Sequence, residues 1–285
     1  MGVWECGRMG VKSLLRPPRT PLPPYFHTPY SYMNAHPPAV IHSADNPVYK
    51  KLMALQTAHG IRKHGEFLVA GPKVIAEALR QKPEAVTAWI ATSEMPPPPD
   101  SLVCGHRAIL GRERFREVNC FGTPGPLLAM RAGQLPAFQP AAPWPEGCSL
   151  FIPFGDPENV GGAIRAAAGL GAARVVLLRE AACPFLPKAV RASAGAIWKI
   201  RLESGSSLDE LAAIKTPPLF ALDMEGTPLE KTKHPACYGL VAGMEGRGLT
   251  EALRRHCRRV SIPMANGIES LNAAAAVAIA LWAWR

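Results

Sequence analysis

Three segments in the second half of the chain set glycines, amides or small polar residues at the end of a short apolar run. They are DPENVGGAIR (156–165), VAGMEGRGLT (241–250) and SIPMANGIESLN (261–272). Loops of this kind, at the ends of strands, are where an α/β sheet holds its ligand. None of the three matches a phosphate-loop or dinucleotide pattern. We therefore predict a pocket for a ligand other than the commonest nucleotides.

The first segment predicts a helix that begins beside an anion site. Asn159 is a residue type that caps helices, and Gly161 and Gly162 would leave backbone amides bare at the positive end of the helix dipole. Arg165 follows Asn159 by six residues and could present a bidentate guanidinium at the same opening. An ordinary capped helix with a solvated arginine is the alternative for this segment taken alone.

The other two segments predict loops that contact one another. Glycines in GMEGRG (243–248) allow close approach to a ligand or a positive φ, and Glu245 either accepts from a neighbouring loop or stays solvated. Ser270 is the expected N-cap of the last helix, and the Asn272 amide is expected to bond a neighbouring loop. GLGAAR (169–174) ends a helix instead of opening one, which predicts a C-terminal glycine cap and no dinucleotide fingerprint.

Taken in order, the segments resemble the motifs of the SpoU (TrmH) family of SPOUT RNA methyltransferases, which read roughly N-x-G-x-x-x-R, G-x-E-G-x-G, and I-P-M followed by S-L-N. The matching residues are Asn159, Gly161 and Arg165; Gly243, Glu245, Gly246 and Gly248; and Ile262, Pro263 and Met264 with Ser270, Leu271 and Asn272. KAVRASAGAI (188–197) also resembles a family segment. The likeness is close over residues 150–285 and weaker over 50–130, where GIRKHGEFLVAGPKVIAEAL is similar to an L30e-like substrate-binding domain.

This resemblance implies ribose 2′-O-methylation of RNA, S-adenosyl-L-methionine as the methyl donor, a deep trefoil knot and a homodimer. It assigns cofactor contacts to the backbone at Gly243, Ile262 and Leu271. It assigns work on the target nucleotide to Asn159 and Arg165, as catalytic residues. A guanidinium with a pKa above about 12 is a poor base, so we expect Arg165 to position phosphate and stabilise the developing alkoxide.

Departures from the family pattern are modest. Met244 replaces a small polar residue, and Ala273 and Ala274 replace a common Val-Ser pair. We expect these residues to face packing or cofactor contacts and to affect affinity without changing the activity.

Two alternative functions share the motifs: a catalytically silent RNA-binding protein of the same fold, and an enzyme that methylates ribosomal RNA against an antibiotic.

Composition agrees with an RNA partner. The net charge of +10 favours an acidic partner, with nucleic acid ahead of an anionic membrane surface. HGIRKH (59–64) and RERFR (112–116) are the candidate RNA contacts outside the pocket, either as phosphate contacts or as solvated basic turns. The N-terminal module favours ribosomal RNA over tRNA as the substrate.

Metal and membrane sites are not expected. The seven cysteines are scattered without a C-x-x-C pair, which is typical of reduced thiols in a cytoplasmic protein. His59 and His64 are five residues apart, which does not suit two helical ligands. The longest apolar run, AAAAVAIALWAW (273–284), is short of the roughly 20 residues that span a bilayer and predicts a buried C-terminal helix.

The chain of 285 residues is long enough for two α/β domains. Residues 1–45 are rich in proline and predict a disordered segment. The segment faintly resembles a transit segment, but its proline density argues against the amphipathic helix that such segments form. Translation that starts at Met33 is an equally compatible alternative. Residues 46–131 predict a small α/β module and residues 132–147 a linker. Strand and helix alternate over residues 148–285, which predicts a mostly parallel sheet covered on both faces. The family resemblance implies that the first of these is the smaller L30e-like domain and the second the knotted SPOUT domain. The expected elements there include helices at 159–169, 207–214, 249–257 and 273–284, and strands at 174–178, 197–202, 218–224, 238–243 and 259–264.

Overall fold

The computed structural model describes residues 39–100, 102, 106–214 and 217–285. Most of the proline-rich segment 1–45 therefore lies outside the described residues. Residues Pro38–Arg285 form one compact unit.

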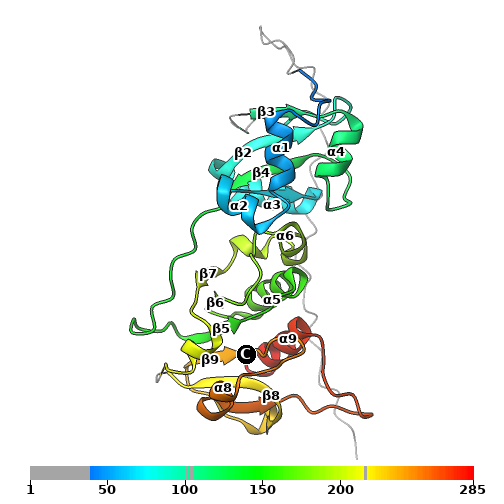
Figure 1. Ribbon diagram of the computed structural model, residues 1–285. Coiled ribbons are helices and arrows are strands. Elements are labelled where there is room, and N and C mark those ends of the chain that lie inside the picture. Colours follow the sequence, from blue (N-terminus) through cyan, green and yellow to red (C-terminus); the bar gives the residue numbers. More distant parts are fainter. Residues whose placement is uncertain (1–38, 101, 103–105, 215–216) are drawn as a thin grey trace, which may run out of the picture. The chain divides into compact units, whose positions relative to one another are not determined.

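The larger sheet has six described strands in the order β10-β8-β9-β5-β6-β7, and every neighbouring pair is parallel (Figure 1). Parallel neighbours need crossover connections, and helices supply most of them here. This confirms the predicted parallel α/β domain, while the trefoil knot stays a prediction. The strands are β5 (Gly147–Ile152), β6 (Arg174–Leu177), β7 (Arg201–Ser204), β8 (Leu219–Pro228), β9 (Cys237–Val241) and β10 (Arg258–Ser261).

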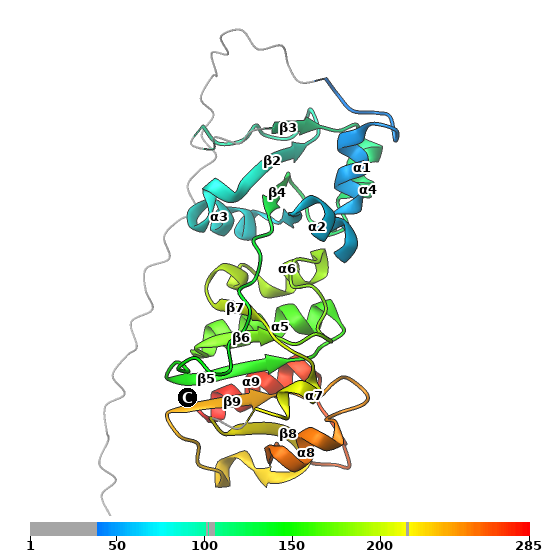
Figure 2. The ribbon, with the colours of Figure 1, turned by 60° about the vertical axis from the view of Figure 1, so that its left-hand side comes forward.

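Helices cover both faces of this sheet because successive side chains of each buried strand point to opposite faces. Leu150 and Ile152 of β5 join a core with residues of α5 and α9, whereas Phe151 joins a second core with residues of α7 and α8. Figure 2 shows the same layers from another direction. The helices are α5 (Pro157–Leu170), α6 (Pro187–Ser193), α7 (Leu208–Leu211), α8 (Glu251–His256) and α9 (Ala273–Ala283).

The smaller sheet has the order β1-β4-β2-β3, with β4 antiparallel to β1 and β2, and β3 parallel to β2. One face packs on α1 and α4, and the other packs on α2 and α3. The expected small α/β module is present, and its boundaries stay a prediction. Its elements are α1 (Pro47–Ala54), α2 (Ala58–His64), β1 (Glu66–Ala70), α3 (Pro72–Gln81), β2 (Val86–Ala91), β3 (His106–Ile109), α4 (Arg112–Val118) and β4 (Leu127–Arg131).

Two local expectations differ from the structure. The basic stretch 59–64 is helical in α2, since Thr57 caps the helix by accepting from the Gly60 amide. The strand expected at 197–202 begins only at Arg201, because Ala194 and Gly195 adopt positive φ and turn the chain into the short 3₁₀ helix Ala196–Trp198.

The predicted linker 132–147 packs on the larger sheet. Phe138 is buried there, and the Arg174 guanidinium lies 4.9 Å from the Phe138 ring centroid and 5.0 Å from that of Trp144. Arg174 also forms an ion pair of 3.1 Å with buried Glu203. A cation that contacts two aromatic rings helps to fix this segment against the sheet.

Candidate functional site

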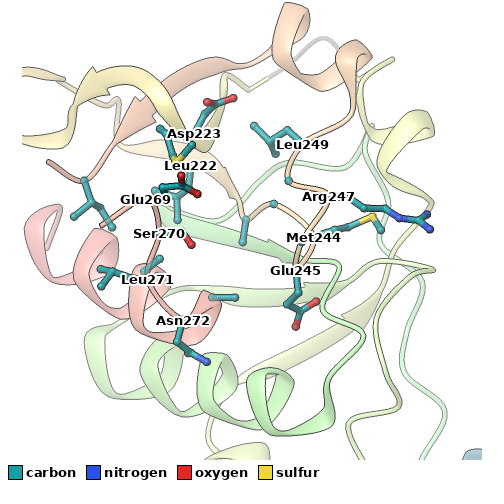
Figure 3. Close-up of a pocket in the computed structure, with 18 of the residues that line it drawn as sticks. Leu222, Asp223, Met244, Glu245, Arg247, Leu249, Glu269, Ser270, Leu271 and Asn272 are labelled. Atoms are coloured by element: carbon teal, nitrogen blue, oxygen red, sulfur yellow. The ribbon is translucent and has the colours of Figure 1, made fainter. Parts of the chain in front are cut away.

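A cavity of about 720 Å³ lies where β9 and β10 end, beside β8. Loops that follow parallel strands meet at the same edge of a sheet, and most of the lining residues come from those loops. Figure 3 shows Met244, Glu245 and Arg247 on one loop and Ser270, Leu271 and Asn272 on another. The second and third motif segments therefore build the pocket that the sequence predicts.

Glycines close the loop after β9 into a tight turn. The Met244 amide donates to the Gly248 carbonyl (2.9 Å), and the Gly248 amide donates to the Met244 carbonyl (2.8 Å). Gly246 and Gly248 adopt positive φ of 75° and 66°, where other residues would be strained. A Cβ at Gly243 would lie 3.1 Å from the Gly248 carbonyl carbon, so a side chain there would push the two arms of the turn apart.

Asn159 joins the three motif segments by hydrogen bonds. Its Nδ2 donates to Glu245 Oε1 (3.0 Å), and its Oδ1 accepts from Asn272 Nδ2 (2.8 Å). Glu245 Oε2 also accepts from the Gly155 amide (3.1 Å). The expectation that Asn272 bonds a neighbouring segment is confirmed, and of the two alternatives for Glu245 the structure shows the one in which it accepts hydrogen bonds.

Asn272, and not Ser270, caps the last helix. Asn272 Oδ1 accepts from the amides of Ala274 (3.0 Å) and Ala275 (3.1 Å), and α9 begins at Ala273. The cap predicted at Ser270 is therefore wrong. Both residue types cap helices well, and the hydrogen bond of Asn272 to Asn159 favours the later start. Ser270 lines the cavity instead.

The first segment also begins its helix earlier than predicted. Asp156 is the N-cap of α5, since its carboxylate accepts from the Glu158 amide and Pro157 suits the first helical position. Gly161 lies inside the helix, where a Cβ would come within 2.3 Å of the Ala189 carbonyl oxygen of α6. A Cβ on Gly162 would lie 3.0 Å from the Ala274 Cβ of α9. These glycines allow close helix packing and are not the bare anion site that we predicted.

The predicted cofactor residues Gly243, Ile262 and Leu271 all line the cavity, as does Asn159. Arg165 does not line it. Arg165 is exposed on α5 and makes no hydrogen bond or ion pair with any residue that the structure describes. Six helical residues separate it from Asn159 by about 9 Å along the axis and about 120° around it, so the two side chains leave different faces.

The residues that depart from the family pattern, and the glycine cap of α5, lie as the sequence predicts. Met244 and Ala273 line the cavity and Ala274 lies against Gly162, as expected for the departures from the family pattern. Gly171, with a φ of 82°, caps the C-terminus of α5 as GLGAAR predicts.

Sequence reasoning missed two charged cavity residues, Asp223 on β8 and Arg254 on α8. Arg254 Nε lies 3.3 Å from Asp223 Oδ2, and the Asp223 side chain is only 5% exposed. The only sequence signal was an acid inside an apolar strand run, LFALD.

No described group of three or more histidine, cysteine or acidic residues could hold a metal ion. The described cysteines are free thiols, and burial raises the pKa of both Cys148 and Cys257 to about 12. Thiols with so high a pKa are poor nucleophiles at neutral pH. Within the described residues, no helix is both long and apolar enough to cross a membrane.

Comparison with known proteins gives a consistent family. Residues 151–282 match the SpoU rRNA Methylase family. Over 254 residues the chain is 42% identical to "Ribosomal RNA small subunit methyltransferase G 2" of Syntrophobacter fumaroxidans, covering 88% of this chain and 50% of that protein. The chain thus spans about half the length of that relative.

Two further likenesses cover nearly whole proteins. The chain is 28% identical over 246 residues to the 23S rRNA (guanosine(2553)-2′-O)-methyltransferase RlmP of Bacillus subtilis, covering 85% of this chain and 97% of that protein. Its fold is similar to the crystal structure of the SpoU methyltransferase AviRb from Streptomyces viridochromogenes in complex with AdoMet. That similarity has a TM-score of 0.72 and 24% identity, and covers 84% of this chain and 96% of the other.

Proposed function

We propose, from the premise that residues 151–282 belong to the SpoU rRNA methylase family, that this chain transfers a methyl group from S-adenosylmethionine to a ribose 2′-hydroxyl of ribosomal RNA. One observation carries the proposal: hydrogen bonds through Asn159 unite all three motif segments at the wall of one cavity. The relative RlmP is named as a 23S rRNA 2′-O-methyltransferase, which supports both the ribose and the ribosomal substrate.

The cavity suits S-adenosylmethionine in size and chemistry. Its volume of about 720 Å³ lies within the range of small-molecule sites. Leu222, Leu249 and Ile262 supply apolar wall for an adenine ring. Gly243, Ile262 and Leu271 would hold the cofactor through their backbone, as the family resemblance implies. When bound, the cofactor supplies an electrophilic methyl group on a sulfonium.

The residues of the chain then orient the acceptor. The Asn159 amide is hydrogen-bonded through its nitrogen to Glu245 and through its oxygen to Asn272, so it offers a preorganised polar group at the cavity wall. The 2′-hydroxyl must lose its proton as its oxygen forms the new bond to carbon. A guanidinium is a poor base, so we assign Arg165 to the phosphate and to the negative charge that develops on that oxygen.

The position of Arg165 supports a homodimer. The side chain lies outside the cavity of its own chain and has no internal partner among the described residues, so the cavity of a second protomer is where we place its action. α9, which packs on α5, exposes Ile279 (40%) and Trp282 (55%). Exposed large apolar side chains on a helix are typical of a subunit interface.

We assign RNA binding to the smaller α/β module, with proposed bounds 46–131 and a linker at 132–147. Arg62 and Lys63 at the end of α2 are exposed and form no ion pair with another described residue. In RERFR, by contrast, Arg112 pairs with Glu94 and Arg114 with Glu117. Unpaired cations gain most from phosphate, so α2 is the better RNA contact.

A methyl-transfer assay tests the function directly. Purified protein is incubated with isotopically labelled S-adenosylmethionine and either ribosomal RNA or tRNA, and ribose methylation is mapped by resistance to alkaline cleavage. We expect one resistant position in ribosomal RNA, and its loss in Asn159→Ala. RNA binding without transfer would favour the catalytically silent alternative, and label on a base would contradict ribose chemistry.

A further inference from the structure

Asp223 carries a buried acceptor at the wall of the cavity that the motif residues do not account for. Its side chain is 5% exposed, and Oδ2 accepts no hydrogen bond from the described residues. Oδ1 accepts from the Glu225 amide (3.0 Å). A buried carboxylate oxygen without a hydrogen bond is costly, and such a group at a binding cavity points to a donor on the ligand.

Two guanidinium groups already neutralise this carboxylate. Arg254 Nε lies 3.3 Å from Oδ2 and Arg259 Nη1 lies 4.0 Å from it, and neither donates a hydrogen bond to that oxygen. A cationic ligand group would be repelled by the two arginines, and an anionic group has no hydrogen to donate to Oδ2. A neutral hydroxyl donor fits the remaining acceptor best.

Asp223 also lies away from the residues assigned to methyl transfer. Figure 3 shows it at one end of the view, beside Leu222, with Glu245 and Asn272 at the other end. Arg254, which covers Oδ2, also lines the cavity and has a 40% exposed side chain, so it has room to turn aside for a ligand. The position suits the nucleoside part of a ligand better than its reacting centre.

We propose that Asp223 accepts a hydrogen bond from a ribose hydroxyl of the cofactor's adenosine and so selects ribonucleoside ligands. This assignment rests on the proposed function, and it adds a side-chain contact to the backbone contacts expected from Gly243, Ile262 and Leu271. A vicinal diol is a good partner for a carboxylate, which is why acids recognise ribose in unrelated nucleotide sites.

Calorimetry with S-adenosylhomocysteine and its 2′-deoxy and 3′-deoxy forms tests the contact in the full chain. Wild-type protein should bind at least one deoxy form about tenfold to hundredfold more weakly than the parent, as expected for a hydrogen bond to a charged group. Asp223→Ala should bind the parent more weakly by a similar factor, and should bind the parent and that deoxy form almost equally. Loss of discrimination together with affinity separates a direct contact from a structural role.

Glu225→Gln is the matched control. Glu225 lies on the same strand, also pairs with Arg259 (3.0 Å), and is not among the cavity-lining residues. It should keep wild-type affinity and discrimination. If Asp223→Ala fails to fold, the wild-type comparison of deoxy forms still decides the matter.

The outcomes are distinguishable. Wild-type protein that binds S-adenosylhomocysteine and both deoxy forms equally would overturn the Asp223 assignment and leave the proposed function standing. Wild-type protein that binds none of the three nucleosides would overturn the proposed function and this assignment with it.

Discussion

Asn159, Glu245 and Asn272 illustrate how much of the site depends on single side chains. Glu245 is 86 residues and Asn272 is 113 residues from Asn159 in sequence, yet both hydrogen-bond to it. Each also accepts a hydrogen bond elsewhere: Glu245 Oε2 from the Gly155 amide, and Asn272 Oδ1 from the Ala274 amide at the start of α9. Removal of one group therefore disturbs two segments at once.

Glu245→Gln should lower methyl transfer about tenfold to hundredfold, because two hydrogen bonds to a charged acceptor are weakened and Asn159 loses its fixed orientation. The measurement is kcat/KM on the RNA substrate. Glu269→Gln removes the same charge from the same cavity without touching this network, and should keep nearly full activity. Equal losses in the two variants would contradict the role given to Glu245.

At the scale of elements, α5 owes its position to glycines that allow close contact with its neighbours. Gly161 faces the backbone of α6, and Gly162 faces α9. The same helix contains Gly169, where an added Cβ would meet open space. Gly169 therefore serves as a control, within the same helix, for the loss of stability that an added methyl group would cause at Gly161.

Gly161→Ala should destabilise the protein by about 1–3 kcal/mol or more, since the new Cβ would lie 2.3 Å from the Ala189 carbonyl oxygen. Gly169→Ala should instead stabilise it by about 0.5–1 kcal/mol through helix propensity. Urea unfolding of both variants gives the measurement. A neutral Gly161→Ala would mean that α5 and α6 do not pack as described.

A second element-scale prediction concerns α3. The hydrogen bond from Arg80 is the main cause that lowers the pKa of Glu77 from 4.5 to about 2, with Gln81 and Lys199 adding to it. A lowered carboxyl pKa stabilises the fold above the unfolded value and loses that stabilisation as the pH falls through the folded value. Glu77→Gln should therefore lower the free energy of unfolding most at neutral pH, by up to about 1 kcal/mol, and lower Tm accordingly, with the difference from wild type vanishing between about pH 4.5 and 2.

Thermal melts of wild type and Glu77→Gln across that pH range test the sign. Arg80→Gln, which removes the largest cause, should reproduce part of the same pH-dependent loss. A difference that grows as the pH falls would refute the assignment.

At the scale of the whole molecule, the basic side chains behind the net charge of +10 differ in whether an acidic side chain pairs with them. Several arginines are held in internal ion pairs, among them Arg179 with Glu210 and Arg255 with Glu251. Arg62 and Lys63 are exposed and lack such pairs within the described residues. RNA affinity should follow the unpaired cations.

The double substitution of Arg62 and Lys63 to glutamine should weaken RNA binding and reduce the slope of log affinity against log salt by about 1 to 2. Arg179→Gln with Arg255→Gln changes the net charge by the same amount and serves as the control. Filter binding at several salt concentrations measures both. An equal fall in slope for the control would assign binding to total charge.

The proposed dimer predicts complementation between two inactive variants. In a mixed dimer of Arg165→Ala and Gly243→Val, one cavity keeps its Gly243 and receives an intact Arg165 from the other protomer. Co-expression with two different tags should recover activity in the doubly purified species. A mixed dimer as inactive as its parents would place Arg165 at the cavity of its own chain.

Sequence by itself indicated that the second and third motif segments meet at one pocket. Gly243, Ile262 and Leu271 follow apolar strand runs, and parallel strands bring their ends to one edge of the sheet. Alternating strands and helices likewise indicated a parallel sheet with two covered faces. These patterns are local, because the spacing of apolar residues along a strand or helix is the same whatever packs against it.

Only the tertiary structure decided what each residue touches. Ser270 and Asn272 are both good caps, and the partner across the cavity, Asn159, selects Asn272. Gly161 looks like an exposed amide until α6 is packed against it, and Asp223 looks like an ordinary strand acid until it is buried beside Arg254. Propensity acts within a few residues, whereas burial and hydrogen bonding depend on segments far apart in the chain, and folding alone brings those together.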